Sequence, residues 1–111
     1  MTTKLDKIED AIADIAAGRP VIVVDDEDRE NEGDLIMAAS KATPEYVAFF
    51  IRHTSGILCT PLTRSDARRL HLTPMVADNV APHATAFTVS IDYAKDLTTG
   101  ISAQERCACI R

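Results

Sequence analysis

Seven carboxylates lie within the ten residues 25–34. With the single Arg29, this segment carries a net charge of −6, whereas the other 101 residues sum to +1. Carboxylates this close repel one another, so folding them costs free energy unless a cation or a basic ligand is present. Because oxygen donors without a thiolate suit hard divalent ions, the segment predicts a site for Mg²⁺ or Mn²⁺.

Two residues inside the acidic segment favour a ligand site over a solvated turn, which is the usual meaning of a charge run. Arg29 offers a planar fork for a phosphate or carboxylate, and Gly33 allows close approach of a ligand to the backbone. The residues from Asp28 to Gly33 partly match the start of an EF-hand calcium loop, but Ala39 occupies the position where that loop needs a bidentate Glu. The sequence therefore excludes an EF-hand.

Apolar stretches on both sides of the acidic segment predict the strands that position it. Residues 21–24 are wholly apolar and β-branched, which indicates a strand covered on both faces. Residues 35–39 predict the next strand, so the acidic residues form a loop between two central strands. Ligands bind at such loops in open α/β sheets.

Helices are predicted from apolar spacing and from capping residues. Leu5, Ile8, Ile12 and Ile15 recur at three- and four-residue steps, which describes a helix with one buried face that closes at Gly18.

Three further helices are predicted where Ser or Thr can cap the first turn. The first begins after Thr43 and has Val47, Phe50 and Ile51 on its buried face. The second begins after Thr63 and ends near Leu70. The third begins after Ser102 and runs to Arg111.

Two more strands and one loop complete the expected organisation. Residues 56–60 form a short apolar stretch before Pro61, and Phe87, Val89 and Ile91 alternate with polar residues as in a half-exposed strand. Residues 71–83 read as a loop. A helix that opens at Ser102 has little room left, so we expect residues 1–111 to be the N-terminal part of a longer single domain.

Composition narrows the class of protein. With 46% hydrophobic and 26% charged residues, the chain is an ordinary globular protein, and it lacks the basic surface that nucleic-acid binding requires. The stretch 1–15 contains no continuous apolar run, which argues against a signal peptide or a membrane span. Three cysteines give no disulfide framework. We therefore expect a cytoplasmic protein that contacts neither membrane nor nucleic acid.

The histidines and cysteines do not show metal-ligand spacing. The three histidines are 18 and 12 residues apart, and only His83 is a candidate substrate contact. Cys107 and Cys109 are two apart on a predicted helix, where side chains point in different directions. Thr99, just before the Ser102 cap, is a candidate contact for an anion at a helix N-terminus, although ordinary turn chemistry explains it equally well.

The string of residues 25–34 closely resembles the signature of the 3,4-dihydroxy-2-butanone 4-phosphate synthase family of riboflavin biosynthesis. Residues 11–24, 42–59, 85–91 and 99–106 resemble the same family in the same order. The resemblance implies an α+β fold, a mixed α/β three-layer sandwich of the synthase type that is incomplete in this chain. It also implies a homodimer, and in bifunctional relatives a GTP cyclohydrolase II domain is attached.

The activity implied by the resemblance is a Mg²⁺-dependent lyase reaction that converts D-ribulose 5-phosphate to 3,4-dihydroxy-2-butanone 4-phosphate and formate. Glu30 would be a metal ligand, with Mg²⁺ or Mn²⁺ as the ion. Enolising a ketose needs a carboxylate base and a Lewis acid. The substrate contacts would be Arg29, Glu30, Asp34 and Thr99, and the catalytic candidates are Glu32, Asp26 and Cys59.

The chain also departs from the family pattern. Family members carry a later Gly-His-Thr-Glu segment, whose His is the second protein metal ligand, followed by a catalytic Glu, and this chain contains neither. Cys109 stands where Thr is usual. Two alternatives therefore stay open: a non-catalytic truncated remnant that still binds metal, and an acidic interaction module.

Overall fold

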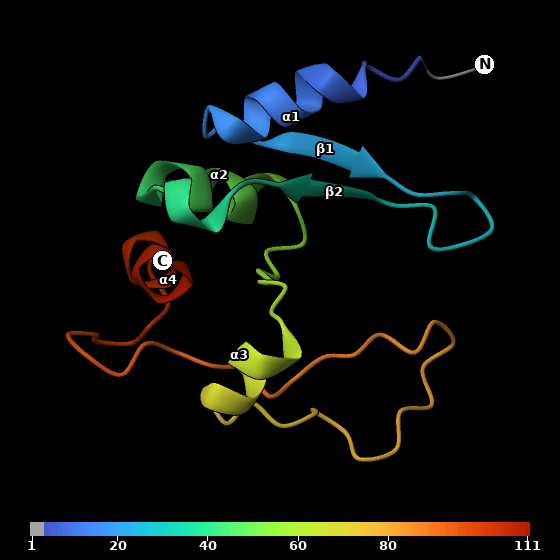
Figure 1. The fold of residues 1–111 in the computed structure, drawn as a ribbon. Coiled ribbons are helices and arrows are strands. Elements are labelled where there is room, and N and C mark those ends of the chain that lie inside the picture. Colours follow the sequence, from blue (N-terminus) through green and yellow to red (C-terminus); the bar gives the residue numbers. More distant parts are fainter. Residues whose placement is uncertain (1–3) are drawn as a thin grey trace.

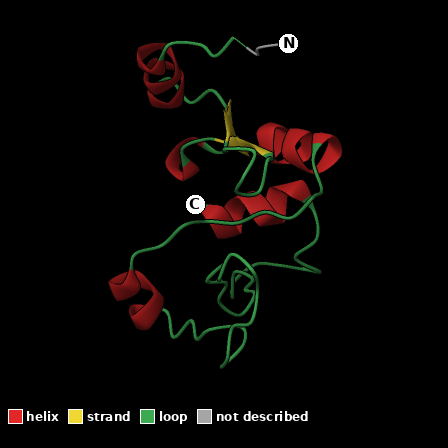
Figure 2. Cartoon of the chain, turned by 90° about the vertical axis from the view of Figure 1, so that its right-hand side faces the viewer, coloured by secondary structure: helices red, strands yellow, loops and turns green. Residues whose placement is uncertain are grey.

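The computed structural model describes residues 4–111 and combines helices with a small antiparallel sheet. The first three residues, part of the stretch 1–15 considered above, lie outside this range. This architecture confirms the α+β class (Figures 1 and 2). In chain order the elements are α1 (Ile8–Ala16), β1 (Val21–Val24), β2 (Gly33–Ile36), the 3₁₀ helix η1 (Ala39–Lys41), α2 (Pro44–His53), α3 (Arg64–Arg69) and α4 (Ala103–Ile110).

β1 and β2 pair directly with each other as an antiparallel hairpin, with Val21 opposite Ile36 and Val24 opposite Gly33. The prediction of a strand at 35–39 was right in existence and wrong in position, because pairing begins at Gly33 and the chain turns into η1 after Ile36. Within residues 4–111 the acidic residues therefore close a two-stranded hairpin, and the predicted larger sheet is not seen. The prediction that β1 is covered on both faces was also wrong, since Ile22 and Val23 are exposed.

All four predicted helices are present, and the three caps form as expected. The side-chain oxygens of Thr43, Thr63 and Ser102 accept hydrogen bonds from the backbone N–H three residues later, at 3.2, 3.1 and 3.1 Å. These bonds satisfy donors that the first helical turn leaves unpaired. For α1 the predicted buried face was wrong, because Ile8 and Ile12 remain exposed.

The core of the described chain lies between α2 and α4. Its buried members are Ala42, Val47 and Cys107, against which Ile51, Leu58, Ala103 and Ile110 pack. Figure 1 shows α4 beside α2 although about fifty residues separate them in the chain. This packing gives the short α4 the tertiary support that an isolated two-turn helix lacks.

The two remaining predicted strands do not form. Residues 56–60 form no strand, beginning with a bend at Gly56, and residues 87–91 make a single bridge, between Thr88 and Pro74. A segment with an alternating or apolar sequence forms a strand only when a neighbouring strand supplies the backbone hydrogen bonds. The loop predicted for 71–83 is confirmed apart from that bridge. Between residues 4 and 111 no helix is both long and apolar enough to cross a bilayer.

Candidate active site

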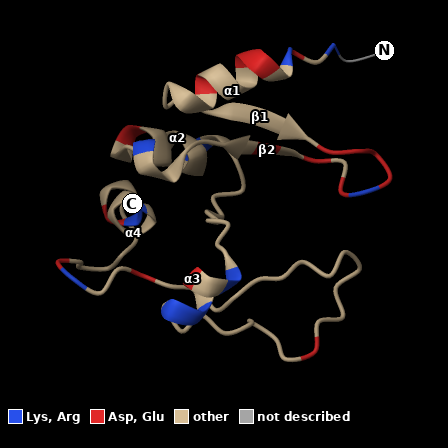
Figure 3. Cartoon of the chain, viewed as in Figure 1, with Lys and Arg blue, Asp and Glu red and all other residues tan. Residues whose placement is uncertain are grey.

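The acidic residues are gathered on the tight loop that joins β1 to β2 (Figure 3). Within this loop the carbonyl of Asp26 accepts hydrogen bonds from the N–H groups of Arg29 and Asn31, at 3.1 and 3.2 Å. Asn31 adopts a positive φ of 50°, which short polar residues tolerate better than most. The loop therefore has a defined backbone, set by its own hydrogen bonds.

Asp25 is the organising residue of the loop. Its Oδ1 accepts from the N–H of Glu32 at 2.8 Å, and its Oδ2 accepts from the N–H of Glu30 at 3.0 Å and from Arg29 Nη1 at 2.9 Å. These donors, with the Glu32 N–H foremost, hold the pKa of Asp25 below its ordinary value. Sequence reasoning missed Asp25, and its place directly after the strand was the only available signal.

The other acidic-loop candidates lie around this centre. Arg29 Nη1 is 3.7 Å from Glu30 Oε2, so the guanidinium lies between the carboxylates of Asp25 and Glu30. Glu30 is half-buried, whereas Asp26 and Arg29 are exposed. The side chain of Glu30 is 27% exposed, so it stays partly accessible to solvent beside Arg29.

A groove of about 730 Å³ begins at the end of this loop. Glu32 and Asp34 contribute from the hairpin, Cys59 from the segment after α2, and Ile110 from α4. The structure thus brings together three residues that the sequence predicts to act in one site, although Cys59 is 25 or more positions from the other two. Sequence reasoning had set His53 aside, but it lines the same groove, as do Thr54 and Ser55.

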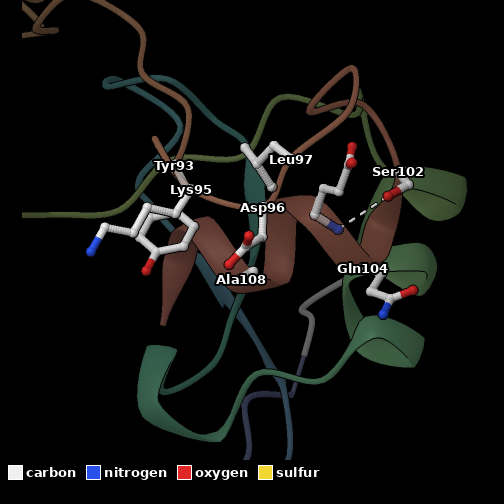
Figure 4. A pocket seen from close by; sticks show the side chains of 8 residues that line it. Tyr93, Lys95, Asp96, Leu97, Ser102, Gln104 and Ala108 are labelled. Carbon is white, nitrogen blue, oxygen red and sulfur yellow. Dashed lines mark hydrogen bonds between the residues drawn. The ribbon is translucent and has the colours of Figure 1, made fainter.

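Thr99 is not brought to this groove. Its Oγ1 accepts a bond of 3.4 Å from the N–H of Ile101, as in an ordinary turn. A second cavity, of about 440 Å³, lies near this turn and is lined by residues that include Tyr93, Ser102 and Glu105 (Figure 4). The predicted contact of Thr99 with the substrate is therefore separated from the acidic loop in this chain.

Glu105 fixes the turn that carries Thr99. Its Oε1 accepts from both the N–H and the hydroxyl of Thr98, each at 2.7 Å, and its Oε2 is shielded from solvent without a hydrogen-bond partner. The Thr98 hydroxyl and N–H are the main causes that lower the pKa of Glu105. Gly100, in the same turn, has a φ of +73°. A Cβ at this position would lie only 2.8 Å from the carboxylate of Asp92, so a larger residue would not fit without a shift.

We expect Glu105→Gln to loosen the turn and to remove a pH dependence. Because the folded pKa of Glu105 is lowered, its ionised form stabilises the chain above the ordinary pKa of 4.5, and this stabilisation is lost as the pH falls through the folded pKa. Urea unfolding at several pH values between about 6 and 3 measures the effect. Glu45→Gln, at an exposed carboxylate in α2, should keep the wild-type pH dependence. A Glu105→Gln chain with an unchanged pH profile contradicts the assignment.

The described residues, including those of the acidic loop, do not form a ready-made metal site. Within residues 4–111 no group of three or more His, Cys, Asp or Glu side chains is arranged to hold an ion. Cys107 is buried in the core and Cys109 is partly exposed, and both are free thiols.

The sequence and the fold match one family throughout. The sequence profile of 3,4-dihydroxy-2-butanone 4-phosphate synthase matches residues 9–111. The chain belongs to this synthase family. Riboflavin biosynthesis protein RibBA of Nocardia farcinica is 62% identical over 109 residues, and that of Mycobacterium tuberculosis is 59% identical. These matches cover 98% of this chain and 26% of each relative.

Solved structures of the synthase family share the fold. A 3,4-dihydroxy-2-butanone 4-phosphate synthase in complex with two magnesium ions superposes with a TM-score of 0.92 at 46% identity, covering 96% of this chain and 50% of that one. A cation-free synthase gives 0.86 at 44% identity, covering 97% and 49%. The chain thus spans about a quarter of the RibBA relatives and about half of these solved synthases.

Proposed function

We propose that this chain contributes the acidic half of a synthase active site that converts D-ribulose 5-phosphate to 3,4-dihydroxy-2-butanone 4-phosphate and formate. The observation that carries the proposal is the groove, which joins Glu32 and Asp34 of the acidic loop to Cys59. Family membership over residues 9–111 supports the reaction class. The mixture of carboxylates and one guanidinium suits a sugar phosphate, which needs both acid–base and anion-binding groups.

Glu30 is the residue proposed to hold the divalent ion. Its carboxylate is half-buried and has Arg29 as a charged neighbour at 3.7 Å. Mg²⁺ is often held by one or two carboxylates, with waters and substrate oxygens completing its shell, so a single Glu from this chain fits that ion. When bound, the ion supplies Lewis-acid stabilisation of negative charge on the sugar oxygens. Mn²⁺ prefers similar oxygen ligands and is proposed as an alternative.

The remaining loop residues are proposed to bind the sugar phosphate and to move protons. Glu32 lines the groove and is the proposed base, and Asp26, an exposed carboxylate of the same loop, is a second proposed proton-transfer group. Arg29 and Asp34 would orient the substrate, and Cys59, which lines the same groove as Asp34, would contact it. Thr99 does not line this groove and is proposed only as an anion contact at the turn before α4. A homodimer and a cytoplasmic location are proposed on the family resemblance.

The metal assignment is tested by measuring Mn²⁺ binding to the chain, with the free ion quantified by electron paramagnetic resonance. We expect Glu30→Gln to weaken Mn²⁺ binding by about tenfold, because it removes the charged ligand. Asp28→Asn removes the same charge from an exposed position of the loop and should weaken binding much less. Equal binding by the wild type and Glu30→Gln would remove Glu30 as a ligand.

The same measurement with substrate tests the reaction class. Ribulose 5-phosphate should tighten Mn²⁺ binding, whereas ribose 5-phosphate, which lacks the ketone, should not. We expect formate release by the 111-residue chain alone to stay at the metal-only background, since it lacks the later Gly-His-Thr-Glu segment. Equal responses to the two sugar phosphates would argue for a metal-binding or acidic interaction module instead.

A further inference from the structure

The groove that begins at the acidic loop carries negative charge. Glu32 and Asp34 are the charged residues among its lining in the described chain, to which no Lys or Arg contributes. A phosphate monoester carries a charge of about −1.5 to −2 near pH 7, so these carboxylates repel it unless a positive group or a strong hydrogen-bond donor lies close by. The phosphate end of a sugar phosphate therefore needs a partner other than the two carboxylates.

The two anion-binding candidates already described do not line the groove. The guanidinium of Arg29 lies at the acidic loop, where its Nη1 is 2.9 Å from Asp25 Oδ2 and 3.7 Å from Glu30 Oε2. These two carboxylates offset its charge. Thr99 belongs to the turn before α4. A phosphate bound in the groove must therefore meet another side chain.

His53 is the lining residue with the chemistry for this contact. An imidazole can carry a positive charge between pH 5 and 8, and it offers an N–H donor in either charge state. His53 is the last residue of α2 and lies on the surface of the chain. Its ring packs against that of Phe49, one turn earlier in the helix, with the ring centroids 4.5 Å apart. This packing restricts the directions in which the imidazole can turn.

The chain that follows His53 is held in a defined turn. The hydroxyl of Thr54 donates to the carbonyl of Phe50 at 2.6 Å and accepts from the N–H of Gly56 at 3.2 Å. Gly56 has a φ of +82°, and its carbonyl accepts from Arg106 Nη1 of α4 at 3.5 Å. The part of the groove wall that includes His53 and Ser55 is therefore fixed from both α2 and α4.

We propose that His53 binds the phosphate group of the sugar phosphate in this groove, while Glu32 and Asp34 contact the sugar from the hairpin. The inference rests on the proposed function for the identity of the ligand. A hydrogen bond from an imidazole to a phosphate is stronger than one to a neutral sugar hydroxyl, because the acceptor is charged. His53 thus favours the phosphorylated ketose over the free sugar.

NMR of the imidazole groups tests this contact directly. The chain has three histidines, so each Cε1–Hε1 signal can be assigned as the one that disappears in His53→Gln, His71→Gln or His83→Gln. With Mg²⁺ present and the pH held constant, ribulose 5-phosphate should move the His53 signal in a saturable way and leave the other two unmoved. Inorganic phosphate should move the same signal at higher concentration, and ribulose without phosphate should not.

Binding by variants gives a second measurement. We expect His53→Gln to raise the ribulose 5-phosphate concentration that half-saturates its effect on Mn²⁺ binding by about tenfold, because a charge-assisted hydrogen bond is lost. His71→Gln makes the same change at an exposed position outside the groove and should leave that concentration unchanged. Equal values for the wild type and His53→Gln overturn the proposal. So does movement of the His83 signal in place of the His53 signal, or an equal response to ribulose without phosphate.

The two measurements separate this inference from the proposed function. If ribulose 5-phosphate tightens Mn²⁺ binding through Glu30 but moves no His53 signal, the contact at His53 is contradicted and the proposed function stands. If inorganic phosphate and ribulose 5-phosphate move the His53 signal equally and neither affects Mn²⁺ binding, the phosphate contact is supported and the proposed function is contradicted.

Discussion

Replacing Asp25 with Asn is expected to loosen the acidic loop and to weaken Mn²⁺ binding, although Asp25 is not a proposed metal ligand. Its two oxygens accept from the N–H groups of Glu30 and Glu32 and from Arg29. Asn has one carbonyl oxygen, so its NH₂ group would face at least one N–H donor and leave it without an acceptor. Hydrogen exchange at the backbone amides of Glu30 and Glu32, measured by NMR, should accelerate by about tenfold.

Asp28→Asn is the matched control for this variant. It removes the same charge from the same loop, but Asp28 is exposed and forms none of the bonds that hold the loop. A general electrostatic effect would weaken Mn²⁺ binding equally in the two variants. A loss confined to Asp25→Asn identifies the loop geometry as the cause, whereas equal losses with unchanged amide exchange contradict it.

The largest effect on stability is expected from Val47→Asp. Val47 is 3% exposed and joins Ala42 and Cys107 in the core between α2 and α4. A carboxylate placed there loses its hydration and gains no partner, which costs about 3 kcal/mol or more. Because the core has so few members, we expect α4 to separate from α2 and helical circular dichroism to fall at 25 °C.

Ala48→Asp controls for the change in helix propensity. Ala48 is the next residue of α2 and is exposed, so it receives the same new side chain without burying it. We expect its urea midpoint to shift by much less than that of Val47→Asp. Similar midpoints for the two variants would mean that the contact between α2 and α4 does not stabilise the chain.

The sequence by itself determined the features that depend on near neighbours in the chain. Thr43, Thr63 and Ser102 cap helices through bonds that span three residues, so the residue types were sufficient to place them. The concentration of acidic residues could also be recognised from the sequence, because seven carboxylates in ten residues do not depend on how the chain packs. The three caps need no distant segment and were predicted correctly, whereas the placement of the acidic loop between two central strands was wrong.

Only the tertiary structure decided which segments meet. It paired β1 with β2 from Gly33 onward, gave residues 56–60 no strand pairing and residues 87–91 a single bridge, and placed Cys59 in the groove that Glu32 also lines. It also showed that Asp25 holds the loop while Thr99 lies apart from it. Strand pairing and burial depend on what lies across from a residue, and an apolar run such as β1 has the same sequence whether its faces are covered or open.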